Sequence, residues 1–241
     1  MDIRLALMTG VDIPIPSCRL VVHQPSIKEI SMIGETDFFV GAQCLTIEKS
    51  MHIKDESLLS TTSNFQIFMT IMTEQEQKDK KKNTLALLEL IFPNDKIVFT
   101  PRALLINRKD ENIIIDENNF EDLQEVFQQM FCLSAAGQQA FNPANEAARK
   151  IAEKLMRGRQ RVAAQRQAEE GGNGSILSQY LSVISVALHI PLQQVAELTM
   201  YQLYDLIERY SLYTNWDLDI RSRLAGGKPE SKPDNWMKII H

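Results

Sequence analysis

NPANEAARKIAEKLMRGRQRVAAQRQAEEGGNG, residues 142–174, is the stretch that decides how this chain is organised. Asn142 is a good N-cap, and Pro143 fits the first position of a helix that no further proline interrupts before the glycine cluster at 171–174. The pattern predicts a helix of roughly seven turns, about 40 Å long. One side of this helix is apolar, with Ile151, Ala152, Leu155 and Val162, and the other carries the basic ridge of Lys150, Lys154, Arg157 and Arg161.

The basic ridge has three interpretations. Lysines and arginines on one side of an amphipathic helix most often form a solvated face, but they can also dock onto an acidic protein surface or contact nucleic acid. No aromatic residue interrupts residues 150–166 to stack on bases, so nucleic acid is the least expected of the three. We therefore treat the ridge as a candidate partner-binding surface for protein.

The charge distribution divides the chain at this segment. The net charge is −5 overall, yet residues 143–174 carry 7 Lys and Arg against 4 Asp and Glu and are basic, whereas residues 1–142 are acidic. We expect an N-terminal α+β domain over residues 1–142, a basic helix with a glycine-rich linker over 143–174, and a helical C-terminal domain with a polar tail over 175–241. We also expect the first and last of these parts to have separate cores.

Short-range patterns predict a small N-terminal sheet with helices packed on it. Ser26 with Glu29 forms a capping box, and Ser63 precedes a segment with apolar residues at helical spacing. Residues 96–106 and 112–115 are rich in β-branched residues and predict a hairpin, with Pro101 at an edge or bulge. The fold class is therefore α+β, followed by the long basic helix and an all-helical C-terminal domain.

The C-terminal part predicts one buried helix and one long amphipathic helix, whose core side is lined by Met200, Leu203, Ile207, Thr214 and Leu218. Residues 175–189 are apolar nearly all round, which predicts burial on most sides, and Thr199 caps a helix that ends near Gly226. Along the second helix, Leu212 and Trp216 fall on the charged side and are candidate partner-binding residues. The alternative is that Trp236, with Ile239 and Ile240 in the tail, folds back over Trp216 as an internal clasp.

The residues that carry chemistry in enzymes are too scattered here to predict a catalytic or metal site. The four histidines lack the spacing of metal ligands, and the three cysteines are far apart, which is typical of reduced thiols in a cytoplasm-like compartment. No run of 18 apolar residues predicts a membrane span, and the N-terminus lacks a signal-peptide cleavage pattern. We expect a non-enzymatic protein that has no cofactor and no bound metal.

Six segments of the chain carry a family resemblance: VDIPIP, IGETDFF, TSNFQIFM, IIIDENNFEDLQEVFQQMF, FNPANEAARKIAEKLMRGRQRVA and LTMYQLYDLIERYSLYTNWDLDIRSRLAGG. Together they resemble bacteriophage tail-region proteins, in particular the baseplate hub assembly chaperones and tail assembly chaperones of contractile-tail phages. This resemblance implies a non-enzymatic assembly factor that binds tail or baseplate subunits in the host cytoplasm and has no cofactor. The alternatives are a structural virion component of the baseplate or connector and, less favoured, a nucleic-acid-binding protein that uses the basic helix.

Overall fold

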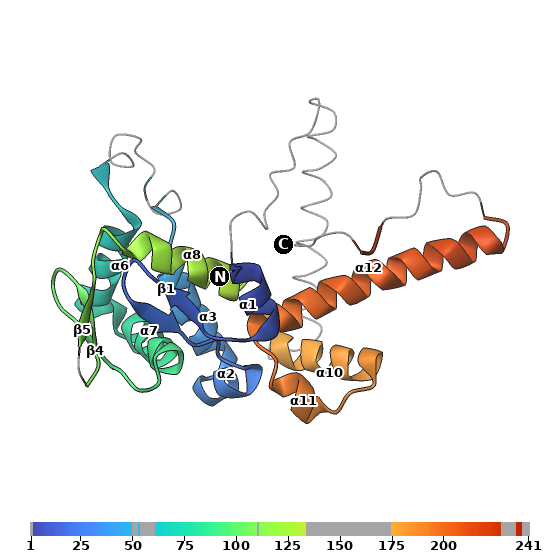
Figure 1. Ribbon diagram of the computed structural model, residues 1–241, viewed down its shortest axis with the longest axis horizontal. Helices are drawn as coiled ribbons and strands as arrows, with labels where there is room; N and C mark the ends of the chain where they lie inside the picture. The colour runs from blue at the N-terminus through green and yellow to red at the C-terminus, as the bar shows by residue number, and fades with distance from the viewer. Residues whose placement is uncertain are drawn as a thin grey trace.

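The computed structural model describes residues 2–49, 53, 61–109, 111–133, 175–227 and 235–237. Within these ranges the fold is α+β with a helical C-terminal part, which confirms the predicted fold class (Figure 1). The predicted helix over 143–174 lies outside the described residues. Its ridge of Lys150, Lys154, Arg157 and Arg161 therefore stays a prediction.

The chain begins with a helix that the sequence patterns did not indicate. Asp2 caps it by accepting bonds from the backbone N–H groups of Arg4 and Leu5 at 3.0 and 3.3 Å. Two short antiparallel strands follow, and their alternating burial turns one face of the hairpin towards the core. These first elements are α1 (Ile3–Thr9), β1 (Ile13–Ile15) and β2 (Leu20–Val22).

The predicted hairpin is confirmed, because the strands Leu104–Asn107 and Asn112–Ile115 pair antiparallel. The first strand, expected over residues 96–106, is divided at Pro101, so the sheet has three antiparallel strands in the order β3-β4-β5. Pro101 lies in the turn between the first two strands, where its missing N–H removes no ladder hydrogen bond. The N–H of Thr100 donates to the carbonyl of Ala103 at 2.9 Å and closes this turn. The strands are β3 (Lys96–Phe99), β4 (Leu104–Asn107) and β5 (Asn112–Ile115).

The predicted capping box of Ser26 and Glu29 is confirmed, and Ser63 forms a second one with Gln66 at the start of the helix expected after it. The five helices that cover the small sheets are α2 (Ile27–Ile33), α3 (Glu35–Leu45), α6 (Asn64–Thr73), α7 (Lys78–Ile91) and α8 (Phe120–Met130), with a 3₁₀ turn η1 (Gln75–Gln77) before α7. Helices α3 and α7 cross closely at Gly41, where an added Cβ would lie 2.8 Å from the carbonyl oxygen of Asn83.

A dense aromatic core fills the N-terminal body. The ring of Phe68 stacks on Phe120 at 5.0 Å between centroids, and Phe38 meets Phe131 edge-on at 5.3 Å. Fully buried phenylalanines from three helices and from the ends of α7 and α8 contribute to this core: Phe38, Phe68, Phe92, Phe120, Phe127 and Phe131.

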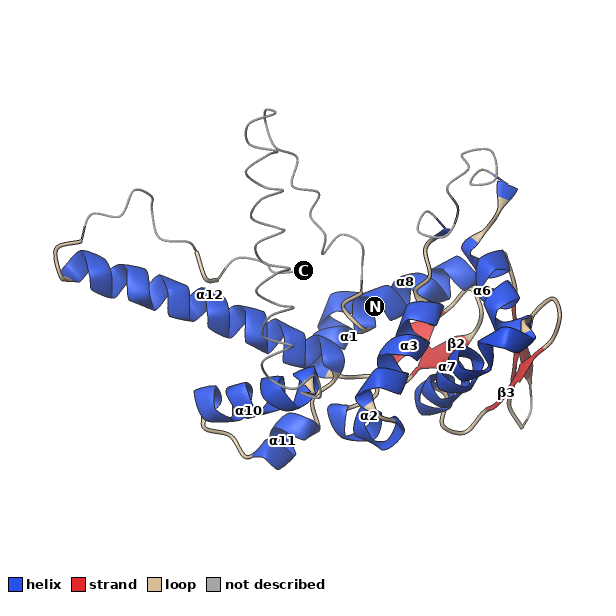
Figure 2. Cartoon of the chain, turned by 180° about the vertical axis from the view of Figure 1, so that it is seen from behind, coloured by secondary structure: helices blue, strands red, loops and turns tan. Residues whose placement is uncertain are grey.

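The C-terminal part consists of α10 (Ile176–Leu188), α11 (Leu192–Ala196) and α12 (Met200–Leu224). Thr199 caps α12 in a capping box with Gln202, as predicted from the sequence. Figure 2 shows α12 extending away from the body on the side opposite the β3-β4-β5 sheet. Among the described residues no helix has the length and apolar character needed to cross a membrane.

The expectation of two separate cores is wrong. Buried side chains of the C-terminal helices, including Leu177, Ile184 and Leu203, belong to the same continuous cluster as those of the N-terminal body. The reason is that the first turns of α12 pack against α1 and α8 and are thereby covered. The domain boundaries at 142 and 174 lie outside the described residues and stay a prediction.

Candidate protein-interaction surface

The N-terminus of α10 is held by a carboxylate from the N-terminal body. The Oε1 of Glu35, the first residue of α3, accepts bonds from the N–H groups of Ile176 and Leu177 at 2.9 and 3.3 Å. Ser175 accepts a third bond from the N–H of Ser178 at 2.9 Å. Three of the four N–H groups that a helix start leaves unpaired are therefore satisfied, and the negative charge lies at the positive end of the helix dipole.

Further polar contacts fix the start of α12 to the same body. The N–H of Ile27 donates to the carbonyl of Leu198 at 2.8 Å, and the Nζ of Lys28 lies 2.7 Å from the Oε1 of Glu197. The side chain of Gln202 donates to the carbonyl of Met8 at 2.9 Å. The C-terminal helices are thus anchored at one end, and the rest of each helix extends from this anchor.

Helix α10 exposes apolar side chains where the sequence predicted burial on most sides. Only Leu177 and Ile184 are buried along this helix, and Val186 is 71% exposed. The helix packs on α11 and on α12, and no element among the described residues covers its outer side. None of its 13 residues is charged. The exposed apolar face of α10 comprises Ile176, Val183 and Val186, with Leu188 at its end and Leu192 of α11 beside it.

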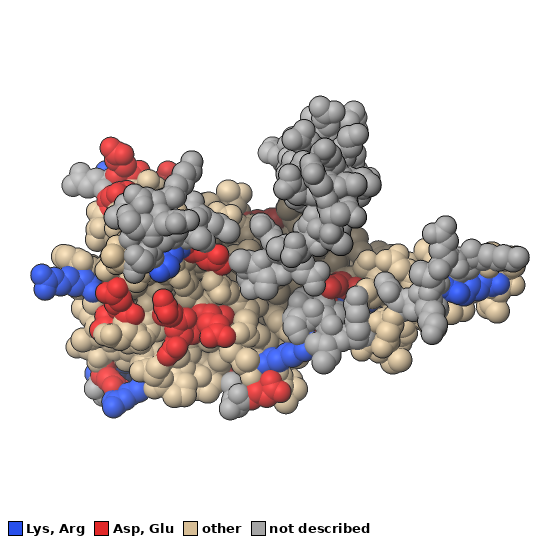
Figure 3. Space-filling model, turned by 90° about the horizontal axis from the view of Figure 1, so that it is seen from above, with Lys and Arg blue, Asp and Glu red and all other residues tan. Residues whose placement is uncertain are grey.

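Helix α12 leaves the core after its first turns. Its buried residues end at Asp205, and beyond that point Leu218 is 59% and Leu224 is 83% exposed. Ion pairs at i,i+4 spacing support the exposed part, with Arg221 2.8 Å from Asp217 and Arg223 3.0 Å from Asp219. Figure 3 shows Asp and Glu side chains gathered over the N-terminal body, with basic side chains at the far end of α12.

The described part of the tail, residues 235–237, returns to the exposed half of α12, and Trp236 makes the contact that the sequence left as an alternative. Ile239 and Ile240, the other predicted members of the clasp, lie outside the described residues. The ring of Trp236 lies 6.4 Å from that of Trp216 and 5.4 Å from that of Tyr213, edge-on to the latter. The Nη1 of Arg209 donates to the carbonyl of Trp236 at 2.7 Å. Of the predicted partner-binding residues, Trp216 and Trp236 are thus brought together, and Leu212 is half-buried beside this cluster on α12.

The thiol of Cys132 and the phenol of Tyr204, near the start of α12, do not have the chemistry of activated nucleophiles. Near the start of α12, burial raises the pKa of the Cys132 thiol to about 12, and the charges of Asp205 and Glu208 act in the same direction. Burial also raises the pKa of Tyr204 to about 12, helped by the neighbouring Tyr180. A thiol with such a pKa is protonated at neutral pH and is a poor nucleophile.

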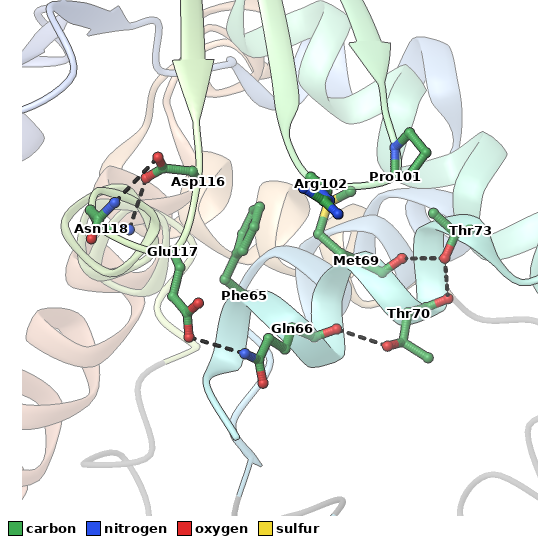
Figure 4. Close-up of a pocket in the computed structure, with 10 residues that line it drawn as sticks. All are labelled: Phe65, Gln66, Met69, Thr70, Thr73, Pro101, Arg102, Asp116, Glu117 and Asn118. Atoms are coloured by element: carbon green, nitrogen blue, oxygen red, sulfur yellow. Dashed lines mark hydrogen bonds between the residues drawn. The ribbon is translucent and has the colours of Figure 1, made fainter. Parts of the chain in front are cut away.

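The N-terminal body also has a hollow on its surface (Figure 4). Phe65 and Met69 of α6 line it, and the β3–β4 turn and the loop before α8 form its other walls. The Asp116 carboxylate accepts a bond from the N–H of Asn118 at 2.8 Å and so serves the local turn. Within the described residues no three His, Cys, Asp or Glu side chains are grouped to hold a metal ion.

Comparison with known proteins points to the C-terminal part of the chain. A family model described as the YomV second domain matches residues 169–241. That family is phage-derived, from a Bacillus prophage, so α10, α11, α12 and the tail are similar to a phage domain. No curated protein and no solved structure matches the chain.

Two features of this surface could not be found by sequence reasoning. The exposure of α10 depends on which elements lie around it, although its lack of charged residues was a visible sign of an unusual helix. The role of Glu35 depends on a contact between residues 141 positions apart, for which the sequence offers no signal.

Proposed function

We propose that this protein is a non-enzymatic phage assembly factor whose C-terminal helices bind a tail or baseplate subunit. The observation that carries the proposal is the exposed apolar face of α10, because an uncharged helix with Ile176, Val183 and Val186 in solvent is unfavourable unless a partner covers it. The match of a phage-derived domain to residues 169–241 supports a phage role for this same part.

The geometry favours binding over catalysis. Helix α10 is anchored at its N-terminus by Glu35, so its outer face is presented in a fixed orientation before any partner arrives. A preorganised apolar face costs less conformational entropy on binding than a flexible segment. The half-exposed aromatic side chains of α12 would extend this surface, since tyrosine and tryptophan are enriched among residues that dominate binding energy.

The test is capture of tail and baseplate proteins from phage-producing cells by the tagged full-length protein, with the captured proteins identified by mass spectrometry. The double variant Val183→Asp/Val186→Asp should reduce their recovery about tenfold or more, the effect of losing 1.4 kcal/mol of binding free energy. Val21→Asp is the control for an aspartate introduced elsewhere, because Val21 is an exposed valine, 43% exposed, on β2 of the N-terminal body.

Three results decide between the candidate roles. Loss of tail proteins with the α10 variant and retention with Val21→Asp would support the proposal. Equal recovery with all three proteins would contradict the assignment of α10 as the binding face. Stoichiometric presence of the protein in purified particles would favour the structural virion component over an assembly factor that leaves.

A further inference from the structure

The hydrogen-bond pattern of the β3-β4-β5 sheet determines which backbone groups of β3 point away from β4. The N–H of Thr100 donates to the carbonyl of Ala103 across the turn between the two strands at 2.9 Å. Alternate residues of an edge strand bond to its partner, so Val98 also directs its N–H and C=O groups to β4. Ile97 and Phe99 alternate with these residues and therefore direct their N–H and C=O groups to the outer edge of the sheet.

The two edges of this sheet differ. At the β5 edge, the Nδ2 of Asn119 donates to the carbonyl of Ile114 at 2.9 Å, and its Oδ1 accepts a bond from the N–H of Asp116 at 2.9 Å. Within the described part of the chain, the outward groups of Ile97 and Phe99 have no such partner. The β5 edge is thus capped in part, whereas the β3 edge is open to pairing with a further strand.

Side-chain burial also shows that the core is incompletely covered at β3. Ile97 and Phe99 face the same side of the sheet as Ile106 and Leu104, their cross-strand partners on β4. The two β4 side chains are fully buried, but Ile97 and Phe99 are only half-buried, although the ring of Phe99 lies 6.0 Å from that of Phe68 in the core. A strand added beside β3 would cover both side chains and pair with their backbone groups.

Three cations lie around the open edge of β3. Lys96 is the first residue of the strand, and Arg102 lies in the turn after it. The Nζ of Lys81 on α7 lies 5.9 Å from the centroid of the Phe99 ring. None of the three forms an ion pair with a described residue. Such an edge repels a basic strand and attracts an acidic one.

We propose that the open edge of β3 binds an extended acidic peptide segment of a partner protein as an added strand of the sheet. The main chain of the segment pairs with the outward N–H and C=O groups of Ile97 and Phe99, and its carboxylates meet Lys81, Lys96 and Arg102. A nucleic acid shares the negative charge but cannot continue the strand pairing. Figure 2 shows β3 at the end of the molecule remote from α10, so the inference does not rest on the proposed function.

The test uses the full-length protein and the acetylated peptide Glu-Glu-Val-Thr-Val-Thr-Val-Glu-Glu as the probe. Backbone amide NMR spectra are followed up to about 1 mM peptide, the range of weak specific binding. The amide signals of Ile97 and Phe99 should shift, and both amides should exchange with deuterium more slowly. The amide of Val98 should keep its exchange rate, because it already bonds to β4.

Two control peptides separate strand pairing from charge attraction and require no change in the protein. The same peptide with N-methyl groups on every valine and threonine keeps its charge but loses its central donors, and it should bind about tenfold or more weakly. The peptide with lysine in place of each glutamate should also bind about tenfold or more weakly.

Protein variants, each checked by circular dichroism to be folded, test the same two features. Ile97→Pro removes an outward N–H that no described residue uses, which an edge strand tolerates, and should weaken binding of the acidic peptide about tenfold or more. Lys81→Ala/Lys96→Ala should weaken it about tenfold, and more at low salt than at high salt. Lys28→Ala, on α2 away from the sheet, should change it less than twofold.

Slower exchange at Ile97 and Phe99 that depends on the peptide's N–H groups and its carboxylates would support the proposal. An acidic peptide that causes no shift near 1 mM would overturn it. Equal binding of the N-methylated peptide, or shifts confined to residues outside β3 and its turn, would overturn it as well.

Discussion

The N-terminal body and the C-terminal helices use apolar side chains in opposite ways. In the body, fully buried phenylalanines stack in pairs, Phe68 on Phe120 and Phe127 on Phe131. In α10 and the far half of α12, apolar side chains lie in solvent, with Val186 71% and Leu224 83% exposed. Apolar content alone therefore does not decide burial, because a second layer must be present to cover each face.

This difference suggests that the N-terminal body determines stability and that the exposed C-terminal helices determine binding. The body is closed on itself by α3, α6, α7 and α8, whereas the C-terminal helices share its core through α10's inner face, Val195 of α11 and the first turns of α12. Changes in the body should affect the free energy of unfolding, and changes on the exposed helices should affect binding. The predictions below test this division from the largest expected effect to the smallest.

Replacing Phe127 with alanine should have the largest effect on stability. This side chain is fully buried and its ring lies 6.0 Å from that of Phe131. We expect the free energy of unfolding to fall by about 3–5 kcal/mol in urea titrations. Val186→Ala, a truncation on the exposed face of α10, should change it by less than about 0.5 kcal/mol. Similar losses of unfolding free energy for the two variants would contradict the distinction between a buried body and an exposed face of α10.

Gly41→Ala should destabilise the body by overpacking. The added methyl group would lie 2.8 Å from the carbonyl oxygen of Asn83 and 3.3 Å from the Cβ of Leu87, so α3 and α7 would have to separate. We expect a loss of about 1–3 kcal/mol in the same titrations. Gln43→Ala, two residues away on the exposed side of α3, is the control and should be nearly neutral. A neutral Gly41→Ala would show that the crossing is loose.

Removing the Glu35 carboxylate should weaken the joint between the two regions. Glu35→Ala leaves the N–H groups of Ile176 and Leu177 without their acceptor, and loss of a helix cap costs about 1 kcal/mol. These two amides should exchange with deuterium faster, while those of α8 should not change. Glu35→Gln keeps an acceptor oxygen and should lose less. Unchanged exchange at both amides would mean that Glu35 does not hold α10.

Acid should remove a small stabilising contribution at the start of α2. Burial opposes the charged form of Glu29, but bonds from the N–H and hydroxyl of Ser26, with His23 close by, lower the pKa of Glu29 below its ordinary value of 4.5. A carboxylate with a lowered pKa stabilises the fold above that ordinary value, and the contribution is lost as pH falls through the folded pKa.

Glu29→Gln should therefore reduce the unfolding free energy at pH 7 by less than about 1 kcal/mol, since the side chain is partly exposed. The difference from the wild type should shrink as the pH falls below 4.5, when the wild-type carboxylate becomes protonated. Urea titrations at several pH values measure this difference in unfolding free energy between the variant and the wild type. A difference that grows towards acid would contradict the sign of this shift.

Sequence reasoning predicted the features that depend on nearby residues. The caps at Ser26 and Thr199 are local hydrogen-bond patterns, and both form as expected. The helix expected after Ser63 also forms. The strand predicted over 96–106 was divided at Pro101 because turn geometry, not strand propensity, decides that position. The exposure of α10 and its anchor at Glu35 depend on residues far away along the chain, which local patterns do not contain.

The candidate site was predicted only in part, because local patterns reveal helix faces but not contacts between distant segments. The position of Trp216 on the charged side of α12 follows from helical periodicity, and its contact with Trp236 was one of two alternatives that the sequence left open. Whether Leu212, Trp216 and Trp236 bind a partner stays a prediction, as does the role of the basic ridge.

Hydrogen–deuterium exchange of the free protein and of its complex with the captured tail subunit tests the central claim most directly. The account predicts that the partner slows exchange in α10 and in the exposed half of α12, while α8 and the β3-β4-β5 sheet keep their free-state protection. New protection confined to the N-terminal body, with α10 and α12 unchanged, would contradict the division of the molecule into a folding core and a binding surface.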